Sequence, residues 1–172
     1  MHVFLTGEMQ VGKSTVIAEF FEHSSKTVDG FMTYWECSDA GFDKLYLAPY
    51  TPHQSASPHK RLLGNRNEVK TDFIPVDNII EVFDAYGKSL LDNSGKCDYI
   101  VMDELGFLES NAEAFIASIM ERVDGDAPII GVLRNCEVSF IQEIRAHENV
   151  VLKDVTIENR GEILRWLLKE DF

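Results

Sequence analysis

The distribution of apolar residues along the chain predicts strands that alternate with helices. His2–Thr6 is a short apolar run ended by Gly7, which is typical of a buried strand. After Lys13, apolar residues recur at the spacing of a helix, at Val16, Ile17, Phe20 and Phe21. The same criteria predict later strands at 99–102, 129–133 and 149–155, and helices at 76–91, 110–123, 138–146 and 156–168.

Between the first helix and the strand at 99–102, the pattern changes. Two stretches rich in β-branched and aromatic residues, 30–36 and 42–47, flank the turn-forming residues 38–41, which predicts a β-hairpin. Residues 49–72 contain three of the five prolines and show little periodicity, so we expect a long loop there.

Side chains that accept hydrogen bonds stand where two of the helices are expected to begin. Ser110 or Asn111 is placed to cap the helix that runs to Val123, and Thr156 is placed to cap the last helix. Strands alternating with helices favour an α/β fold with a mostly parallel sheet. We expect one domain over residues 1–172, because neither an internal repeat nor a linker interrupts the pattern.

Composition narrows the classes of partner. The chain has 172 residues, 45% of them hydrophobic, and a formal net charge of −13 from 16 Lys+Arg against 29 Asp+Glu. Such an acidic chain is not expected to bind nucleic acid or an anionic membrane non-specifically. The sequence has neither an apolar run of about 20 residues nor a secretory signal. With three widely spaced cysteines, these features predict a soluble cytoplasmic protein.

The strongest motif follows the first strand. The pattern G-x-x-x-x-G-K-[ST] is met in full by Gly7, Glu8, Met9, Gln10, Val11, Gly12, Lys13 and Ser14, with Thr15 next in the helix. Glycines let the backbone approach a phosphate group so that its N–H groups and the helix N-terminus face the negative charge. In such a phosphate-binding loop (P-loop), Lys13 reaches the β- and γ-phosphates and the Ser14 hydroxyl ligates Mg²⁺.

The second motif is acidic and directly follows the strand at 99–102. Asp103 is placed at the carboxyl edge of the sheet, where ligands of parallel sheets bind, and is expected to hold Mg²⁺ with Ser14. Glu104 follows it and can orient and deprotonate an attacking water. Two adjacent carboxylates repel each other unless a cation lies beside them, which also favours a metal at this place.

In these motifs the chain resembles the small P-loop nucleoside-triphosphatases, also called cancer-related nucleoside-triphosphatases. The likeness rests on the P-loop, on GF-x-T-x-x-E at 30–36, on DELGFLES at 103–110 and on the T-x-x-N-R turn at 156–160. The resemblance implies a RecA-like sheet and Mg²⁺-dependent hydrolysis of ATP, GTP and other nucleoside triphosphates with loose base selectivity. It also implies that Asn159 and Arg160 lie beside the base or ribose.

This chain departs from the family pattern at two positions. Gln10 stands where the family usually has glycine, and Phe107 stands where it usually has lysine. Glu109 matches the acid of the family.

Other charged residues are weaker candidates. Arg134 follows the strand at 129–133 and could stabilise charge on the γ-phosphate, although an exposed loop arginine is the plainer interpretation. Arg61 and Arg66 in the expected loop could cover a bound nucleotide, or they could simply be solvated. Asn159 and Arg160 have an alternative role as first-turn residues of the last helix.

The sequence therefore favours a cytoplasmic, Mg²⁺-dependent nucleoside-triphosphatase with Glu104, Lys13 and Arg134 in the chemistry. One alternative is a nucleotide or small-molecule kinase, which would need an acceptor pocket near the hairpin and residues 49–72. Another is a nucleotide-dependent accessory module with little turnover of its own, and the changes at Gln10 and Phe107 keep it open.

Overall fold

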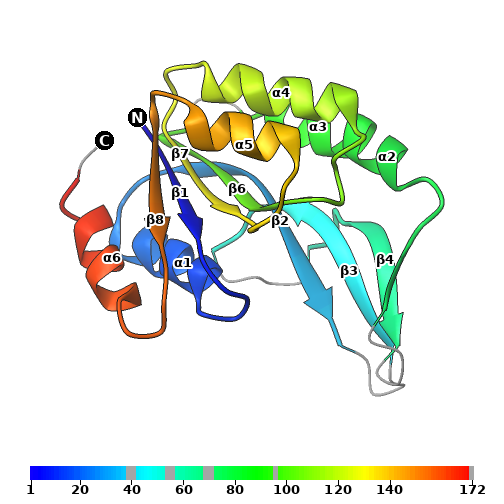
Figure 1. The fold of residues 1–172 in the computed structure, drawn as a ribbon, viewed down its shortest axis with the longest axis horizontal. Helices are drawn as coiled ribbons and strands as arrows, with labels where there is room; N and C mark the ends of the chain where they lie inside the picture. Colours follow the sequence, from blue (N-terminus) through cyan, green and yellow to red (C-terminus); the bar gives the residue numbers. More distant parts are fainter. Residues whose placement is uncertain (38–41, 53–56, 68–71, 95–96, 171–172) are drawn as a thin grey trace.

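A single twisted sheet organises the part of the chain that the structure describes. The structure is a computed structural model and describes residues 1–37, 42–52, 57–67, 72–94 and 97–170 (Figure 1). Its eight strands lie in the order β5-β4-β3-β2-β6-β7-β1-β8. Their bounds are β1 His2–Thr6, β2 Val28–Glu36, β3 Phe42–Pro49, β4 Arg61–Asn67, β5 Phe73–Pro75, β6 Tyr99–Leu105, β7 Ile129–Leu133 and β8 Val150–Asp154.

The sheet has a parallel part and an antiparallel part. Strands β2, β6, β7, β1 and β8 pair in parallel, whereas β3, β4 and β5 extend the sheet from β2 by antiparallel pairing. The prediction of a mostly parallel α/β sheet with a hairpin after the first helix is thus confirmed. The predicted turn at 38–41 lies outside the described residues.

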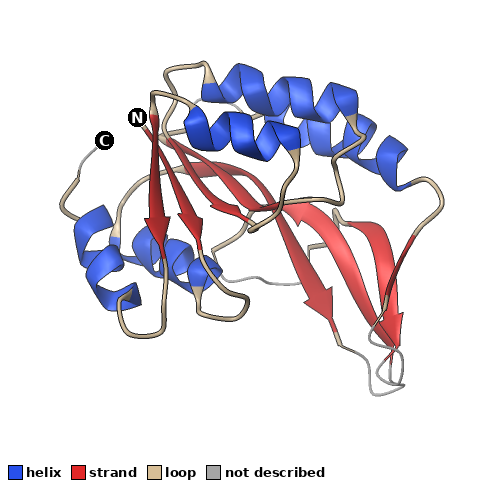
Figure 2. Cartoon of the chain, in the orientation of Figure 1, coloured by secondary structure: helices blue, strands red, loops and turns tan. Residues whose placement is uncertain are grey.

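Helices cover both faces of the parallel part (Figure 2). Helices α1 (Lys13–His23) and α6 (Arg160–Leu167) contact each other on one face. The other face carries α3 (Lys88–Asp92), α4 (Glu113–Val123) and α5 (Ser139–Ala146). Side chains of a strand alternate between faces, so Val3 and Leu5 pack with the first pair of helices while Phe4 packs with the second group.

The helix predicted at 76–91 is present but irregular. It consists of α2 (Ile79–Glu81), a π-helical stretch η1 (Val82–Gly87) and α3. The remaining predicted helices and parallel strands agree with the structure to within a few residues, except that α6 begins at Arg160 after a turn.

The prediction of a long loop over 49–72 is wrong for 61–67, which form β4, whereas the described residues 50–52 and 57–60 lie outside helices and strands. Strand β4 pairs with β3, and β5 follows as the edge strand. The antiparallel register has an irregularity between Leu45 and Tyr46, and Gly64 stands within β4. Glycine and charged residues in a half-exposed strand weaken the alternation by which strands are recognised in a sequence.

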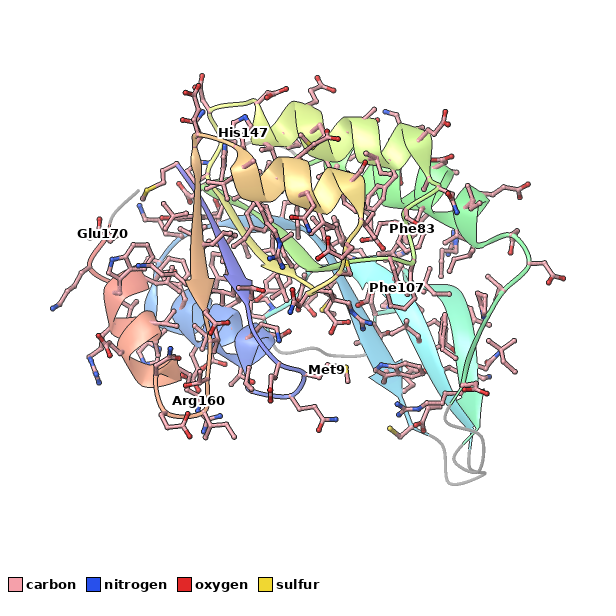
Figure 3. The ribbon with its side chains drawn as sticks, viewed as in Figure 1. Met9, Phe83, Phe107, His147, Arg160 and Glu170 are labelled. Carbon is pink, nitrogen blue, oxygen red and sulfur yellow. The ribbon has the colours of Figure 1, made fainter. Side chains whose placement is uncertain are left out.

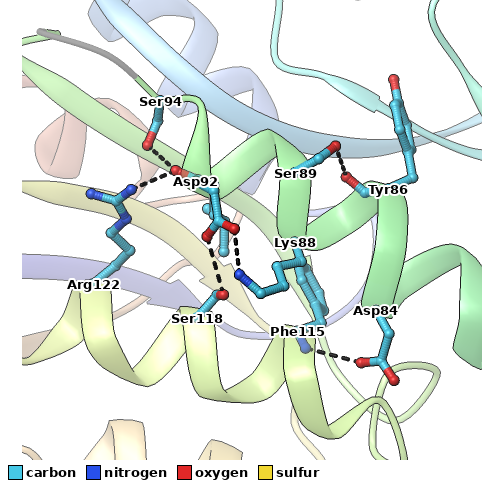
Figure 4. Close-up of polar contacts among 10 residues, drawn as sticks. Asp84, Tyr86, Lys88, Ser89, Asp92, Ser94, Phe115, Ser118 and Arg122 are labelled. Carbon is cyan, nitrogen blue, oxygen red and sulfur yellow. Dashed lines mark hydrogen bonds and ion pairs between the residues drawn. The ribbon is translucent and has the colours of Figure 1, made fainter.

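The predicted cap of α4 is also wrong. The residue before the helix is Ala112, and neither Ser110 nor Asn111 caps it. Instead, Asp84 of η1 accepts a hydrogen bond from the backbone N–H of Phe115 at 3.0 Å (Figure 4). An amide of the first turn, which has no partner within the helix, is therefore satisfied by a neighbouring helix.

Strand order determines where functional residues gather. Strand β1 lies between β7 and β8, and β6 lies next to β7. Because these strands are parallel, their carboxyl ends meet at one edge, where the P-loop, Asp103, Glu104 and Arg134 all follow or end a strand.

Candidate nucleotide-binding and catalytic site

The P-loop connects β1 to α1 in a conformation that needs its glycines. Gly7 has a φ of 124°, and a Cβ built on it would lie 2.4 Å from the carbonyl oxygen of Val155. Gly12 has a φ of 97° immediately before α1. Gln10 also adopts a positive φ, 63°, which is uncommon for a residue other than glycine.

The side chain of Lys13 forms hydrogen bonds to the backbone of the P-loop. Its Nζ donates hydrogen bonds to the carbonyl oxygens of Gly7, at 3.0 Å, and Glu8. Burial lowers the pKa of Lys13, while the carboxylates of Glu104 and Asp103 act in the opposite direction. The ammonium therefore lies at the mouth of the loop, where phosphate oxygens would take the place of the two carbonyls.

The side-chain oxygen atoms of Ser14 and Asp103 lie next to each other. The Ser14 hydroxyl donates to Oδ1 of Asp103 at 3.0 Å, which joins residues 89 positions apart in the sequence. Asp103 is 2% exposed, and burial, with a contribution from Glu104, raises its pKa to about 7. A hydroxyl and a carboxylate oxygen are the hard donors that Mg²⁺ prefers, and Mg²⁺ usually takes its other ligands from water and substrate phosphates. The donor set of this chain fits a magnesium ion.

Glu104 is held by one side chain from β2 and one from the loop after β7. Its Oε2 accepts hydrogen bonds from Thr33 Oγ1 at 2.9 Å and from Arg134 Nη2 at 3.1 Å. Its φ is 72°, which turns the backbone out of the strand direction where β6 ends. Arg134 in turn lies across Gly106, since a Cβ built there would be 2.7 Å from its Cδ.

The loop after β6 is fixed by a buried acid. Glu109, 3% exposed, accepts a hydrogen bond from the backbone N–H of Gly106. Burial raises the pKa of Glu109 to about 7. The carboxyl of Glu109 faces its own loop and serves to shape the segment that follows Glu104.

A cavity of about 900 Å³ is bordered both by the P-loop and by Glu104. Glu104 and Ser14, which the sequence places 90 positions apart, line the same cavity. Thr15 of α1 and Arg134 also line it. The full lining comprises Gly7, Glu8, Met9, Gln10, Gly12, Lys13, Ser14, Thr15, Trp35, Arg66, Glu104, Phe107, Val132, Arg134, Asn135 and Cys136.

A second cavity of about 690 Å³ also borders the P-loop. Thr6, Gly7 and Val11 line it together with Arg145 and the turn at 154–158. The acidic side chains Glu8, Asp154 and Glu158 line it as well.

The turn before α6 separates the roles expected for Asn159 and Arg160. Asn159 accepts a hydrogen bond from the backbone N–H of Thr156 at 2.8 Å, and its own N–H donates to Thr156 Oγ1 at 3.2 Å. This reciprocal pair resembles a capping box, so Thr156 does organise the start of the helix. The guanidinium of Arg160 lies against the P-loop, with Nη1 3.2 Å from a Cβ built on Gly12. Asn159 is used by the turn, whereas Arg160 faces the phosphate site.

Arg61 and Arg66, the two arginines expected in a loop, both lie on β4, and their side chains contact different residues. Arg66 lines the larger cavity, pairs with Asp43 at 2.8 Å and lies 4.5 Å from the centre of the Trp35 ring. Arg61 instead lies over the ring of Tyr86. Only Arg66 therefore faces the P-loop.

Sequence reasoning did not assign Thr33 to the site. Thr33 lies on β2, whose neighbour is β6, so only the pairing of these strands reveals its contact with Glu104. The G-F-x-T-x-x-E match was the signal that could have identified it.

Comparison with known proteins now decides the family. A family described as NTPase matches residues 2–168. The chain belongs to this NTPase family. It is 30% identical to the cancer-related nucleoside-triphosphatase homolog of Bos taurus, over 95% of this chain and 92% of the relative. It is 26% identical to the nucleoside-triphosphatase THEP1 of Methanosarcina barkeri, over 88% of this chain and 87% of the relative.

Solved structures of NTPase relatives share the fold. The crystal structure of THEP1 from Aquifex aeolicus matches with a TM-score of 0.72 and 22% identity, over 98% of both chains. The solution structure of a human cancer-related nucleoside triphosphatase matches with a TM-score of 0.67 and 23% identity, over 98% of this chain and 95% of that one. The P-loop NTPase fold and the family expected from the sequence are thus confirmed.

Two further observations concern the surroundings of this NTPase. In the described ranges, each helix is too short or too polar to cross a membrane. The three cysteines are all described, and none of them forms a disulfide.

Proposed function

We propose that the chain hydrolyses nucleoside triphosphates, including ATP and GTP, to the diphosphate and phosphate with the help of Mg²⁺. The observation that carries this proposal is the meeting of Ser14, Asp103 and Glu104 at the P-loop. Ser14 bonds to Asp103 at 3.0 Å, and Glu104 lines the cavity into which the loop opens. Membership of the NTPase family supports the same reaction.

Binding would begin at the P-loop. Backbone N–H groups from Gly7 to Ser14 and the N-terminus of α1 would receive the phosphates, and Lys13 would exchange its carbonyl partners for β- and γ-phosphate oxygens. Ser14 and Asp103 would hold Mg²⁺, which when bound neutralises charge between the β- and γ-phosphates.

Glu104 is our candidate for the group that receives the proton of the attacking water. Thr33 and Arg134 both donate to Oε2, so we assign Oε1 to the water. The water oxygen would form a bond to the γ-phosphorus as the bond to the β–γ bridging oxygen breaks, and its proton would pass to Glu104. Arg134, beside Glu104, would stabilise charge on the γ-phosphate.

The nucleoside would point away from Glu104. Since Lys13 and Asp103 mark the γ-phosphate end, the α-phosphate lies toward Thr15 and Gly12. The Arg160 guanidinium lies beside Gly12. We therefore propose that the ribose and base lie near the turn at 154–160. A cytoplasmic location, with its supply of nucleoside triphosphates and Mg²⁺, suits this function.

The test is phosphate release from ATP, GTP, CTP and UTP, with and without Mg²⁺. We expect Mg²⁺-dependent release by the wild type from several of these nucleotides, and none above background by Lys13→Ala. Equal release by both proteins, or release that survives chelation of Mg²⁺ by EDTA, would contradict the proposal.

A further inference from the structure

The larger cavity extends past the region that a triphosphate occupies. Its lining includes Trp35 on β2 and Arg66 on β4, two residues that pair antiparallel with β3. Its volume of about 900 Å³ is at the upper end of the range for pockets that bind whole small molecules. A γ-phosphate with its metal and its water needs only the end near the P-loop.

The direction of the nucleotide leaves this space open. With the γ-phosphate beside Glu104 and Arg134, the nucleoside extends toward Arg160, away from Trp35. One nucleotide cannot place its γ-phosphate at Glu104 and its base on Trp35 without reversing its orientation on the P-loop.

Trp35 and Arg66 have the chemistry of a site for a flat, negatively charged ligand. Trp35 is half-buried, packs edge-on against Phe73 with ring centres 6.0 Å apart, and carries the Arg66 guanidinium over its ring, 4.5 Å from the ring centre. Arg66 keeps 42% of its side chain exposed although it pairs with Asp43. An aromatic ring can stack on a heterocycle, and a guanidinium can bind phosphate through two N–H groups.

Phe107 brings a second aromatic group to the same opening. It is 50% exposed on the loop after β6, and the Arg134 guanidinium lies 5.7 Å from its ring centre. Figure 3 labels Phe107 and the P-loop residue Met9, which is 82% exposed, on the side of the P-loop that faces β2 and β3. Large apolar side chains thus line the same cavity as the cationic side chains of Lys13, Arg66 and Arg134.

We propose that this part of the cavity binds a second ligand, a small molecule with a flat heteroaromatic ring and a phosphate group, of the chemical class of nucleoside monophosphates. The ligand takes the γ-phosphoryl group in competition with water. This inference rests on the proposed binding of a nucleoside triphosphate at the P-loop.

The transfer needs no further reagent. A phosphate oxygen of the acceptor forms a bond to the γ-phosphorus, and the bond from that phosphorus to the β–γ bridging oxygen breaks with its electron pair staying on the diphosphate. The attacking oxygen is already ionised, so Glu104 has no proton to remove. Water attack needs Glu104, and transfer to this acceptor does not.

Binding can be observed through Trp35 itself. The chain has two tryptophans, and Trp166→Phe leaves Trp35 as the only one. We expect AMP or CMP to change the fluorescence of this variant in a saturable way when Mg²⁺ and a non-hydrolysable ATP analogue already saturate the P-loop. The absence of a change would contradict the proposal. A change caused by the analogue, together with competition between the analogue and AMP, would place the base of the triphosphate on Trp35 and overturn it.

Transfer is tested with γ-labelled GTP and AMP or CMP as acceptor. We expect labelled ADP or CDP, and we expect Glu104→Gln to retain this product while it loses phosphate release to water. Arg66→Gln should raise the KM for the acceptor by about tenfold, since it removes a charged hydrogen-bond donor. Arg61→Gln, a change of the same kind on the same strand but outside the cavity, should leave that KM unchanged.

Three results would count against the acceptor. They are the absence of labelled diphosphate, an equal KM in the Arg66 and Arg61 variants, and loss of transfer in Glu104→Gln. Arg66→Lys, which keeps the charge that faces Asp43, should fall between wild type and Arg66→Gln and so separates ligand binding from loss of folding. Phosphate release without acceptor should be the same in Arg61→Gln as in the wild type. If the wild type releases no phosphate in the absence of acceptor, the proposed hydrolysis is contradicted. The fluorescence of Trp35 then tests separately whether the second ligand binds.

Discussion

Arg134 Nη2 lies 3.1 Å from Glu104 Oε2, so the residue that we assign to γ-phosphate charge is paired with the residue that we assign to water activation. The pair joins the loop after β7 to the end of β6, and both side chains are about one-third exposed or less. A γ-phosphate arriving between them would compete for the guanidinium. The ion pair therefore couples the position of the carboxylate to the occupancy of the site.

Replacing Glu104 by Gln should separate binding from chemistry. The amide keeps the size of the side chain and cannot take a proton, so we expect nucleotide affinity close to wild type and phosphate release lower by about a hundredfold or more. Nucleotide binding by calorimetry and phosphate release measure the two quantities. Glu8→Gln, another acid that lines the cavity, is the control and should remain active. Unchanged release in Glu104→Gln would refute the assignment.

Thr33 should act as a positioning residue. Thr33→Val keeps the shape of the side chain and removes the hydroxyl that donates to Glu104. We expect kcat to fall by about tenfold, the value of one hydrogen bond to a charged group, with little change in KM. Thr33→Ser should restore kcat because it returns the donor. If the Val and Ser variants behave alike, the hydroxyl has no such role.

The requirement for magnesium should depend on Ser14 and Asp103. Ser14 Oγ and Asp103 Oδ1 lie 3.0 Å apart; Ser14→Ala removes the hydroxyl, and Asp103→Asn removes the negative charge of the carboxylate. We expect the Mg²⁺ concentration for half-maximal phosphate release to rise by about tenfold or more. Ser14→Thr keeps the hydroxyl and should stay close to wild type. A Mg²⁺ titration of phosphate release that is unchanged in the Ala and Asn variants would exclude the proposed metal ligands.

Stability should fall as the pH rises from about 4.5 to about 7. Burial raises the pKa of Glu109 from 4.5 to about 7, so the folded chain holds this proton more tightly than the unfolded chain does. The contribution is greatest below about pH 4.5 and is lost as the pH approaches 7, with a total of up to about 3 kcal/mol. Urea unfolding between pH 4 and pH 8 measures it. Glu109→Gln should flatten the profile, although the raised pKa of Asp103 keeps part of the slope. An identical profile in the variant would contradict this account.

The cap that Asp84 supplies to α4 should be measurable in the free energy of unfolding. Asp84→Ala removes the acceptor of the Phe115 N–H, and we expect a loss of about 1 kcal/mol. The control is Asp126→Ala, because Asp126 is exposed in a bend of the chain. Equal unfolding midpoints for the two variants would show that the cap contributes nothing.

The sequence predicted those parts of the site that depend on local pattern. The P-loop is contiguous, and an acid at the end of an apolar strand has a known place in a parallel sheet, so Lys13, Ser14, Asp103 and Glu104 could be grouped before any coordinates. Arg134 was grouped in the same way, from the end of β7.

Contacts between strands distant in sequence could not be predicted in this way. Thr33 and Arg66 reach the site through the pairing of β2 with β6 and of β4 with β3. Strand β4 itself was missed because Gly64 and charged residues obscure its alternation. The cap of α4 was missed because Asp84 lies 31 positions before its partner. In each case, the tertiary arrangement decided the outcome.

The hydrogen bonds of Lys13 to Gly7 and Glu8 change what an affinity measured on this chain would mean. The ammonium occupies its own cradle, so phosphate entry is an exchange of one set of oxygen partners for another. Breaking these two hydrogen bonds makes the measured free energy of nucleotide binding less favourable. In return, the same bonds hold the P-loop in one shape, so the loop has less to reorganise when the nucleotide arrives.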